Sequence, residues 1–288
     1  MTAPYLTAPY LTAPYLFAGG VAVVTGAAGG IGEALALELA ARGSHLALVD
    51  RDGAGLERVV QTIRGRWPGL RVTAHTFDLS HVSEIPTLAE EILLRHGRVS
   101  LLINNAGIAL GGTFEQITLE QFESLQTVNL RAPVALCKAL LPALRSTLGA
   151  QIVNVSSLYG IIAPAGQTAY SASKFALRGF SEALRHELAP LGIGVTVVHP
   201  GGVRTGIARN AGRAAGLDGR ESAAGLREME RLLTLPPGVA ATTILNAAAH
   251  RAPRVLVGND ARVIDLVARL LPGTYWRAVL WLSARWSA

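Results

Sequence analysis

Three side chains in the middle of the chain have types and a spacing that suit proton transfer. Tyr170 and Lys174 stand four residues apart, and Ser157 lies thirteen residues before Tyr170. In a helix, a separation of four places the phenol and the ammonium on one face. A cation near a phenol stabilises the phenolate and so lowers a pKa that is ordinarily about 10. We therefore expect Tyr170 to exchange a proton with an alcohol or carbonyl oxygen near neutral pH, while Ser157 holds that oxygen by a hydrogen bond.

Taken alone, this spacing is also typical of an ordinary helix, in which Tyr170 is a half-buried aromatic and Lys174 a solvated charge. The surrounding elements must decide between the two interpretations. The run Ala169–Leu188 predicts a helix, and the apolar run Gln151–Val155 predicts a buried strand that ends just before Ser157.

A glycine-rich turn near the N-terminus predicts a dinucleotide site. Val21–Thr25 is an apolar, β-branched run typical of a buried strand, and the run that begins at Glu33 is a strong helix former. Between them, Gly26, Gly30 and Gly32 have the spacing G-x-x-x-G-x-G. Strand, turn and helix in this order place a pyrophosphate on free backbone N–H groups at the helix N-terminus.

Asp50 bears on the choice between NAD and NADP. It ends a second predicted strand, His45–Asp50, and follows Gly32 by 18 residues, which suits contact with an adenosine ribose. A carboxylate accepts from a 2′-hydroxyl and repels a 2′-phosphate, and residue 29 is Gly rather than a basic anchor. We therefore expect NAD. Arg51 leaves NADP as the alternative, because a guanidinium beside the ribose suits the phosphate.

Five motifs stand in one order along the chain: Thr25–Gly32, Asn104–Gly107, Val128–Leu130, Ile152–Ser157 with Tyr170 and Lys174, and His199–Thr205. Together they resemble the short-chain dehydrogenase/reductase family, in its single-domain type, over roughly residues 19–258. The resemblance implies that Tyr170 is the general acid/base, that Lys174 contacts the nicotinamide ribose and lowers the pKa of Tyr170, and that Ser157 orients the substrate oxygen. It also implies that Asn129 orders a water that continues a proton relay from Lys174. No member of this catalytic set departs from the family pattern.

The same resemblance implies a cofactor-binding set. Asp78 matches the acidic residue that flanks the adenine, and the backbone around Pro200, Val203 and Thr205 matches the segment that holds the nicotinamide carboxamide. The full set is Gly26, Gly30, Ile31, Gly32, Asp50, Arg51, Asp78, Leu79, Asn105, Ala106, Gly107, Tyr170, Lys174, Pro200, Gly201, Val203 and Thr205. The histidines lack the spacing of metal ligands, so we expect no metal.

The alternation of apolar runs and helical stretches predicts one α/β domain, a Rossmann-type doubly wound parallel sheet with a helical C-terminal extension. Further strands are expected at Val99–Ile103, Arg71–Phe77, Gly194–Val198 and Arg254–Val257. A long helix is expected over Leu119–Leu148, with an irregularity at Pro133 and Pro142.

Composition limits the environment and the partners. The net charge of +6 comes from scattered arginines without basic runs, so we expect no nucleic-acid binding. The single cysteine, Cys137, excludes an intrachain disulfide and favours a reducing, cytoplasmic location. Because Cys137 lies in an apolar helical run, we expect it to serve packing rather than chemistry.

Both ends of the chain are unusual. Residues 2–16 are three copies of Thr-Ala-Pro-Tyr-Leu, which predict a flexible arm over residues 1–18; the alternative is an arm that docks on a neighbouring subunit or a membrane through its tyrosines. Residues 259–288 form an amphipathic, aromatic tail with a break at Pro272-Gly273. The run Tyr275–Trp286 is too short to span a bilayer, so the tail either lies on a membrane as a peripheral contact or packs on its own domain or a second subunit.

Two further segments suggest the substrate. Residues 202–236, with a helical stretch at Leu226–Leu233, correspond in the family to a mobile lid over the substrate, and the loop Leu158–Thr168, with Tyr159, Ile161, Ile162 and Pro164, would form the opposite wall. Both are mostly apolar, so we expect a hydrophobic secondary alcohol or ketone, interconverted with NAD(H). The alternatives are an NADP(H)-dependent carbonyl reductase, a non-catalytic dinucleotide-binding regulatory protein and, less well matched in length, an epimerase or dehydratase. By resemblance, we expect a homodimer or tetramer.

Overall fold

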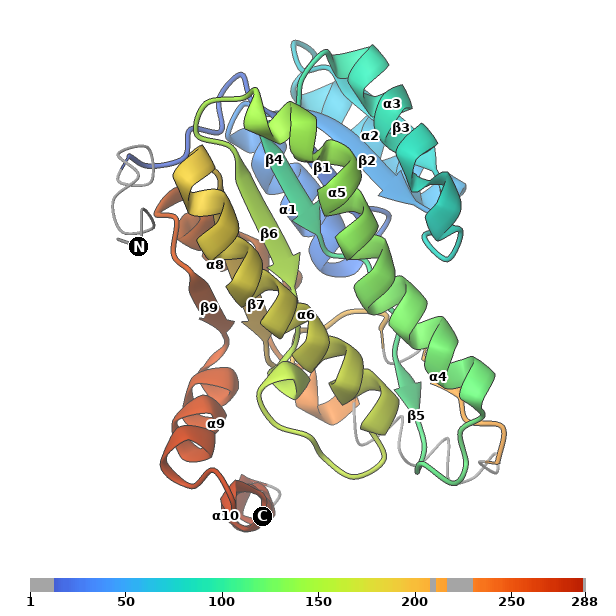
Figure 1. The fold of residues 1–288 in the computed structure, drawn as a ribbon, viewed down its shortest axis with the longest axis vertical. Helices are drawn as coiled ribbons and strands as arrows, with labels where there is room; N and C mark the ends of the chain where they lie inside the picture. Colours follow the sequence, from blue (N-terminus) through green and yellow to red (C-terminus); the bar gives the residue numbers. More distant parts are fainter. Residues whose placement is uncertain (1–12, 208–210, 217–229, 287–288) are drawn as a thin grey trace, which may run out of the picture.

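A computed structural model describes residues 13–207, 211–216 and 230–286 (Figure 1). Its centre is a sheet of seven strands in the order β3-β2-β1-β4-β6-β7-β9, with every neighbouring pair parallel. The strands are β1 (Val21–Thr25), β2 (His45–Asp50), β3 (Val72–Thr76), β4 (Leu101–Asn104), β6 (Gln151–Val155), β7 (Gly194–Pro200) and β9 (Arg254–Val257). The predicted doubly wound parallel sheet is confirmed.

The strands form where the sequence offers short, nearly continuous apolar runs. Every residue of β1, β6 and β7 is buried, which is what a parallel sheet covered on both faces requires. The bounds predicted for β1, β2, β6 and β9 agree with the structure. The predicted bounds of β3, β4 and β7 each differ from the structure by one or two residues at an end.

Helices cover both faces of this sheet. α1 (Gly30–Ala41), α2 (Gly53–Arg66) and α8 (Pro237–Ala249) pack with Val24 in one apolar core, whereas α3 (Ile85–His96), α5 (Ala132–Arg145) and α6 (Thr168–Leu188) pack with Val23 in the other. The side chains of successive residues of β1 thus point into opposite cores. Cys137 is buried in the second core, and burial raises the pKa of its thiol to about 12, as suits a packing residue.

The long helix expected over Leu119–Leu148 is interrupted before its first proline. α4 (Leu119–Gln126) and α5 are joined by a π-helical turn, Thr127–Arg131, and Pro133 lies in the first turn of α5, where its missing N–H costs little. Pro142 lies inside α5, which continues to Arg145. The irregularity predicted at the prolines is therefore at residues 127–131, a position that buries Asn129.

The described part of the N-terminal arm is packed on the domain. Tyr15 is only 5% exposed, its N–H donates to the carbonyl of Ala249, and its hydroxyl lies 2.8 Å from that of Ser100. Ser100 donates its own proton to the carbonyl of Val21, so the phenol of Tyr15 is the donor to Ser100. Of the flexible arm predicted for residues 1–18, the part at Tyr15 is thus packed against the domain beside β1. Residues 1–12 lie outside the described residues, so the flexibility of the arm stays a prediction.

The tail consists of two helices that extend from the last strand (Figure 1), α9 (Asn259–Leu270) and α10 (Tyr275–Trp286), and the predicted break lies between them. α9 packs on its own domain: Ala261 is fully buried, and Asp265 accepts two hydrogen bonds, of 2.6 and 3.2 Å, from the guanidinium of Arg254 in β9. Among the described residues, no helix is both long and apolar enough to cross a membrane.

We predict that Tyr15 anchors the arm. Tyr15→Phe should lower the free energy of unfolding by about 1 kcal/mol, because it deletes one buried hydrogen bond. Tyr15→Ala should lower it by about 3 kcal/mol, because it also leaves a cavity. Denaturant unfolding measures both. Leu16→Ala, at a side chain that is 79% exposed, is the matched control and should change stability little; an equal loss at both positions would contradict the anchoring of Tyr15.

Candidate active site

The glycine-rich turn and the segment Asn105–Gly107 lie side by side at the carboxyl ends of the sheet. β1 and β4 are neighbours, and the strand order reverses between them, which is where open α/β sheets bind ligands. Thr25 joins the two ends: its hydroxyl accepts from the N–H groups of Asn105 and Ala106, each at 3.0 Å. The amide of Asn105 donates in return to the carbonyl of Thr25 at 2.9 Å.

The turn after β1 fits a pyrophosphate. Gly26 and Gly30 have positive φ angles of 67° and 58°, which L side chains rarely adopt, and a Cβ on Gly32 would collide with the carbonyl of Gly26. Gly29 precedes α1 in an extended conformation, no side chain caps the helix there, and a Cβ on Gly29 would meet no atom within 4 Å. The N–H groups of the first turn, including that of Ile31, therefore have no side-chain cap, as an anion site at a helix N-terminus requires.

Asp50 sits beside this turn at the end of β2. One carboxylate oxygen accepts from the N–H of Ala28 and the other from that of Asp52, both at 3.0 Å. Arg51 is exposed and lies near Asp78, whose pKa is lowered chiefly by its hydrogen bonds with Ser80. The neighbouring Leu79 is buried in the core. A further arginine, Arg58, donates to the carbonyl of Ala28 at 3.0 Å; no motif in the sequence indicated it.

The segment after β7 closes toward the same turn. A Cβ on Gly30 would lie 3.1 Å from the side chain of Thr205, so Thr205 reaches the start of α1. Pro200 ends β7, and Val203 is buried. Asp260 of α9 holds the intervening loop, because its carboxylate accepts from the N–H of Gly202 at 2.7 Å and fills the space beside Gly201. Nothing in the sequence around Asp260 signals this contact.

The structure brings Ser157, Tyr170 and Lys174 together. Tyr170 and Lys174 lie in α6, where Tyr170 is 8% and Lys174 3% exposed. The hydroxyl of Ser157 is a hydrogen-bond partner of the Tyr170 phenol, and the Lys174 ammonium lies 5.7 Å from the centroid of the Tyr170 ring. Lys174 also donates to the carbonyl of Val155 at 3.1 Å. These three groups form a compact unit between β6 and α6.

The pKa values differ from the sequence-based expectation. Burial raises the pKa of Tyr170 to about 12, with the hydrogen bond from Ser157 opposing the rise, and burial lowers the pKa of Lys174 to about 8. The expected lowering of the Tyr170 pKa by Lys174 is therefore not found in this arrangement, because desolvation disfavours the charged form of both groups. At neutral pH, Tyr170 is a proton donor.

Asn129 and Gly107 border the same unit. The amide of Asn129 is fully buried, accepts from the N–H of Ile108 and donates to its carbonyl, both at 2.9 Å, and donates to Ser173 at 3.1 Å. A Cβ on Gly107 would lie 3.2 Å from Asn129 Oδ1 and 3.3 Å from Lys174 Nζ. The π-helical turn thus places Asn129 beside Lys174, while the proton relay through Asn129 stays a prediction.

The surroundings of Tyr170 are apolar. Tyr159 packs edge-on against it with ring centroids 6.0 Å apart, and the same cluster includes Ile108, Ile117 and Phe122. The predicted lid contributes Ile207 and Ala211 to the cluster, and it is held there by pairing of β5 (Leu110–Gly111) with β8 (Gly212–Arg213). Its predicted helical stretch is helical at residues 230–232 and otherwise begins outside the described residues.

The opposite wall differs from the prediction. Of the loop Leu158–Thr168, Tyr159 packs on Tyr170, but Ile161 and Ile162 are buried against Ala261 of α9 instead. The reason is that the short 3₁₀ turn after Ser157 faces the tail, an element whose position the local sequence does not reveal. Residues from the loop after β4, including Ile108, take their place.

His199 lies in the fifth motif, but the sequence predicted no role for its side chain. Its ring is fully buried at the end of β7, and Nδ1 lies 2.9 Å from the backbone oxygen of Ser157. Because a carbonyl only accepts, Nδ1 carries the proton. The β6–β7 pairing ends at Val155 and Val198, and beyond it the imidazole of His199 supplies a side-chain donor to the backbone of Ser157.

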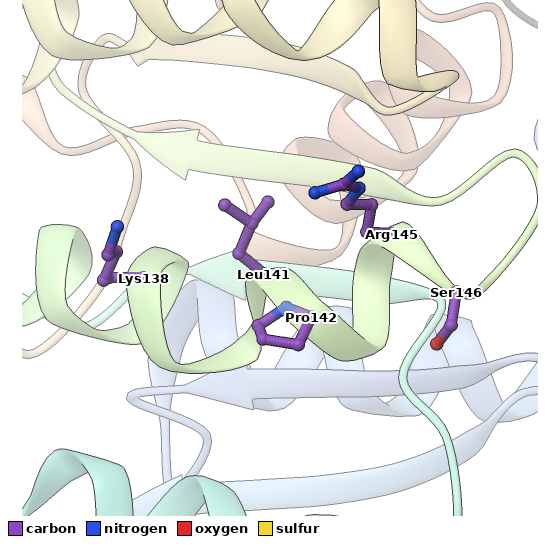
Figure 2. Close-up of a pocket in the computed structure, with 5 residues that line it drawn as sticks. All are labelled: Lys138, Leu141, Pro142, Arg145 and Ser146. Atoms are coloured by element: carbon purple, nitrogen blue, oxygen red, sulfur yellow. The ribbon is translucent and has the colours of Figure 1, made fainter.

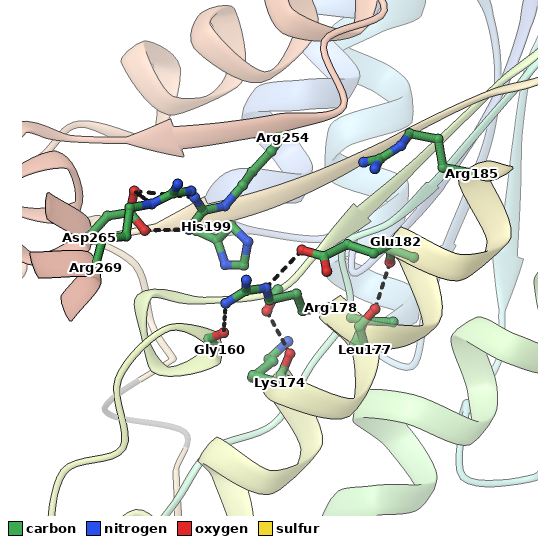
Figure 3. Close-up of polar contacts among 12 residues, drawn as sticks. Gly160, Lys174, Leu177, Arg178, Glu182, Arg185, His199, Arg254, Asp265 and Arg269 are labelled. Carbon is green, nitrogen blue, oxygen red and sulfur yellow. Dashed lines mark hydrogen bonds and ion pairs between the residues drawn. The ribbon is translucent and has the colours of Figure 1, made fainter. Parts of the chain in front are cut away.

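The charges around His199 favour its neutral form. The pKa of His199 is lowered to about 4, chiefly by burial and also by the charges of Arg254 and Arg178, whereas the hydrogen bond to Ser157 and the charge of Asp265 oppose the lowering. Both arginines are themselves engaged: Arg254 with Asp265, and Arg178 with Glu182 at 2.9 Å (Figure 3). His199 is therefore a fixed, uncharged donor to the backbone of Ser157 at neutral pH.

A surface pocket of about 450 Å³ lies elsewhere, on α5 (Figure 2). Its lining residues are Lys138, Leu141, Pro142, Arg145 and Ser146. None of these belongs to the catalytic or cofactor-binding set, so the pocket is separate from the site around Tyr170.

Comparison with known proteins agrees with this geometry. A family model described as short chain dehydrogenase matches residues 20–216. The Mycobacterium tuberculosis protein named "Putative oxidoreductase SadH" is 40% identical over 266 residues, which cover 91% of this chain and 95% of that protein.

Solved structures give the same result for the fold. A short-chain dehydrogenase/reductase from Burkholderia phymatum, in complex with NAD, has a TM-score of 0.81 and 29% identity, covering 89% of this chain and 95% of that one. A short-chain dehydrogenase from Burkholderia cenocepacia, in complex with NADP, has a TM-score of 0.73 and 28% identity, covering 86% and 100%. Neighbours of this fold thus bind either dinucleotide.

We predict that the donor on His199 positions Ser157. His199→Leu should lower kcat about tenfold, because it removes a buried hydrogen bond to the Ser157 backbone. His199→Asn should retain most of kcat, because its Nδ2–H group stands at nearly the place of Nδ1. Steady-state kinetics and thermal unfolding measured on both variants separate positioning from folding. Equal kcat values for the two variants at equal stability would rule out this role.

Proposed function

This chain belongs to the short-chain dehydrogenase/reductase family and is an NAD(P)-dependent oxidoreductase, and from that premise we propose that it interconverts a hydrophobic secondary alcohol and the matching ketone with NAD(H). The observation that supports this most directly is the buried unit of Ser157, Tyr170 and Lys174 beside the glycine-rich turn. A non-catalytic dinucleotide-binding protein would have no need to bury a lysine beside a phenol.

Each residue of the catalytic unit has its own role in the proton transfer. In ketone reduction, Tyr170 donates its phenolic proton to the carbonyl oxygen, for which its protonated state at neutral pH is the correct one. In alcohol oxidation the phenolate of Tyr170 takes the proton from the alcohol, and the hydrogen bond from Ser157 favours that phenolate. Ser157 hydrogen-bonds the same oxygen and fixes its distance from Tyr170.

The dinucleotide, when bound, supplies or accepts the hydride. The turn Gly26–Gly32 would hold its pyrophosphate, Asp50 its adenosine ribose, and Lys174 its nicotinamide ribose. The backbone of Asn105, Ala106 and Gly107 would line the nucleotide between these points, and the loop from Pro200 to Thr205 would cover the nicotinamide. The uncapped N-terminus of α1 supports this assignment, because it offers unblocked N–H donors to an anion.

Asp50 supports NAD as the preferred dinucleotide. Its carboxylate is fixed by the N–H groups of Ala28 and Asp52, so a negative charge stands beside the turn. A 2′-phosphate would bring further negative charge to that place. Arg51 and Arg58 are the cations that could offset it, but Arg58 is already engaged with the carbonyl of Ala28.

The apolar cluster around Tyr170 supports a hydrophobic substrate. Ile108, Phe122 and Tyr159 pack with Tyr170, and the lid adds Ile207 and Ala211. A polar or charged substrate would lose its hydration there without gaining partners. A ketone or alcohol with apolar substituents loses little and is held by Ser157 and Tyr170 at its one oxygen.

The proposal is tested with a panel of apolar secondary alcohols and ketones, followed by nicotinamide absorbance. Wild type should turn over members of the panel, and Tyr170→Phe should lower kcat/KM about a thousandfold, because it lacks the acid/base hydroxyl. Alcohol oxidation should speed up as the pH rises, since burial holds the pKa of Tyr170 high and the phenolate is the active form.

Tyr15→Phe is the matched control for that test. Tyr15 is also a buried phenol hydrogen-bonded to a serine, but it lies at the arm, so its loss should leave kcat/KM unchanged. Tight binding of NAD without turnover of any substrate would support the non-catalytic alternative. Turnover undiminished in Tyr170→Phe would refute the role of Tyr170.

Cofactor preference gives a separate prediction. Asp50→Ser should weaken NAD binding and improve NADP binding, shifting the ratio of kcat/KM values about tenfold toward NADP, because the repulsive charge is removed. Kinetics with both dinucleotides measure this ratio. Asp52→Ser is the control: it removes a neighbouring carboxylate but keeps an oxygen that can cap α2, and the ratio should stay as in wild type.

A further inference from the structure

α9 has two unlike faces. Ala261 and Asp265 are buried, and Ile264 and Ala268 pack toward Leu158 and Ile162 of the domain. On the other side, Val263 is 40%, Leu266 58% and Leu270 70% exposed. Their spacing of three and four residues makes one continuous apolar stripe along the helix. Because the inward face of α9 is already packed on the domain, only a partner from outside this domain can cover the apolar stripe.

Further large apolar side chains are exposed past the end of α9. Leu271 is 43% exposed and follows Leu270 directly, and Leu280 of α10 is 52% exposed. A few exposed leucines are normal on any surface, but five large apolar side chains along 18 residues of two successive helices are a concentration. We call these five side chains and the arginines among them the tail surface.

The charges of the tail surface are of one sign. Arg262, Arg269 and Arg277 are exposed. The two carboxylates of residues 259–280 are turned to the domain: Asp260 accepts from the N–H of Gly202, and Asp265 binds Arg254 as well as Arg269. The tail surface therefore combines apolar side chains with cations and offers no exposed carboxylate within these residues.

We propose that the tail surface docks on an anionic lipid bilayer as a peripheral membrane contact. Leucines bury apolar area at the boundary of headgroups and acyl chains, and arginines pair with anionic headgroups at about 1 kcal/mol each. A second copy of this chain fits less well, because a two-fold contact would set the same three arginines against each other. α10 is too short to span the bilayer, so the contact lies in the interface.

The tail surface is connected to the active site. The hydroxyl of Tyr275 accepts from the N–H of Ala163 at 3.1 Å, and Tyr275 and Trp276 pack with Leu158 and Ile161 in one cluster. The segment that follows Ser157 thus rests on the helices that would touch the membrane. A hydrophobic substrate, such as the proposed function has, concentrates in the lipid bilayer, and docking brings the active site to that bilayer. This consequence rests on the proposed function, whereas the docking itself does not.

Flotation with vesicles tests the docking without any turnover. Full-length protein should float with vesicles of phosphatidylcholine and phosphatidylglycerol at low salt, and much less with phosphatidylcholine alone or at high salt, because exposed charges are then screened. Leu266→Glu with Leu270→Glu should lower the bound fraction about tenfold by removing apolar contact and adding negative charge. Leu94→Glu is the matched control, since Leu94 is 87% exposed on α3 and should leave binding unchanged.

A second variant keeps the test interpretable if the leucine variant misfolds. Arg262→Gln with Arg277→Gln keeps the leucines and should weaken binding to the anionic vesicles about tenfold while leaving the thermal unfolding temperature in place. Wild-type protein that fails to float, or variants that float like wild type, would overturn the proposal. So would a dimer in solution that dissociates in the leucine variant without any vesicle binding, because the tail surface would then be a contact between two copies. None of these outcomes depends on whether the protein turns over an alcohol.

Discussion

A buried ammonium is the constraint on which the rest of the site depends. Lys174 is 3% exposed, and taking its charge out of water has to be offset by acceptors and by π electrons nearby. The carbonyl of Val155 at the end of β6 supplies one and the ring of Tyr170 the other. A Cβ on Gly107 would lie 3.3 Å from the ammonium, a tight contact, so glycine at this position leaves room for the cation. The end of β6, the loop after β4 and the helix α6 are thus arranged around the space that one cation needs.

The same burial explains why the phenol and the ammonium titrate away from their usual values in opposite directions. Desolvation raises the pKa of Tyr170 from 10.0 to about 12 and lowers that of Lys174 from 10.5 to about 8, so two groups with nearly equal ordinary pKa values move apart. Helical spacing correctly predicted that the two groups meet. It could not predict how far water is excluded from them, because that depends on the packing of Tyr159, Ile108 and the lid around α6.

Residues to which the motifs assigned no role hold the catalytic and cofactor-binding segments in place. His199 donates to the backbone of Ser157, and Asp260 of α9 accepts from the loop that follows β7. The ion pair of Arg254 with Asp265 fixes α9 to β9. The tail therefore helps to support the active site. The contacts of Asp260 and Asp265 cross the boundary predicted at Gly258 and join the tail to the domain.

The sequence by itself determined the strands with continuous apolar runs, the glycine-rich turn, and the identity of Ser157, Tyr170 and Lys174, because each depends on local geometry or on spacing along one element. It did not determine the π-helical turn that places Asn129, since no local signal marks it, nor which way Ile161 and Ile162 face. Three identical repeats gave no reason to single out Tyr15, which is buried because it stands just before β1 and reaches Ser100. Only the tertiary structure decided these points, because the burial of a side chain and its hydrogen-bond partners depend on residues that are distant in the sequence and that the fold brings together.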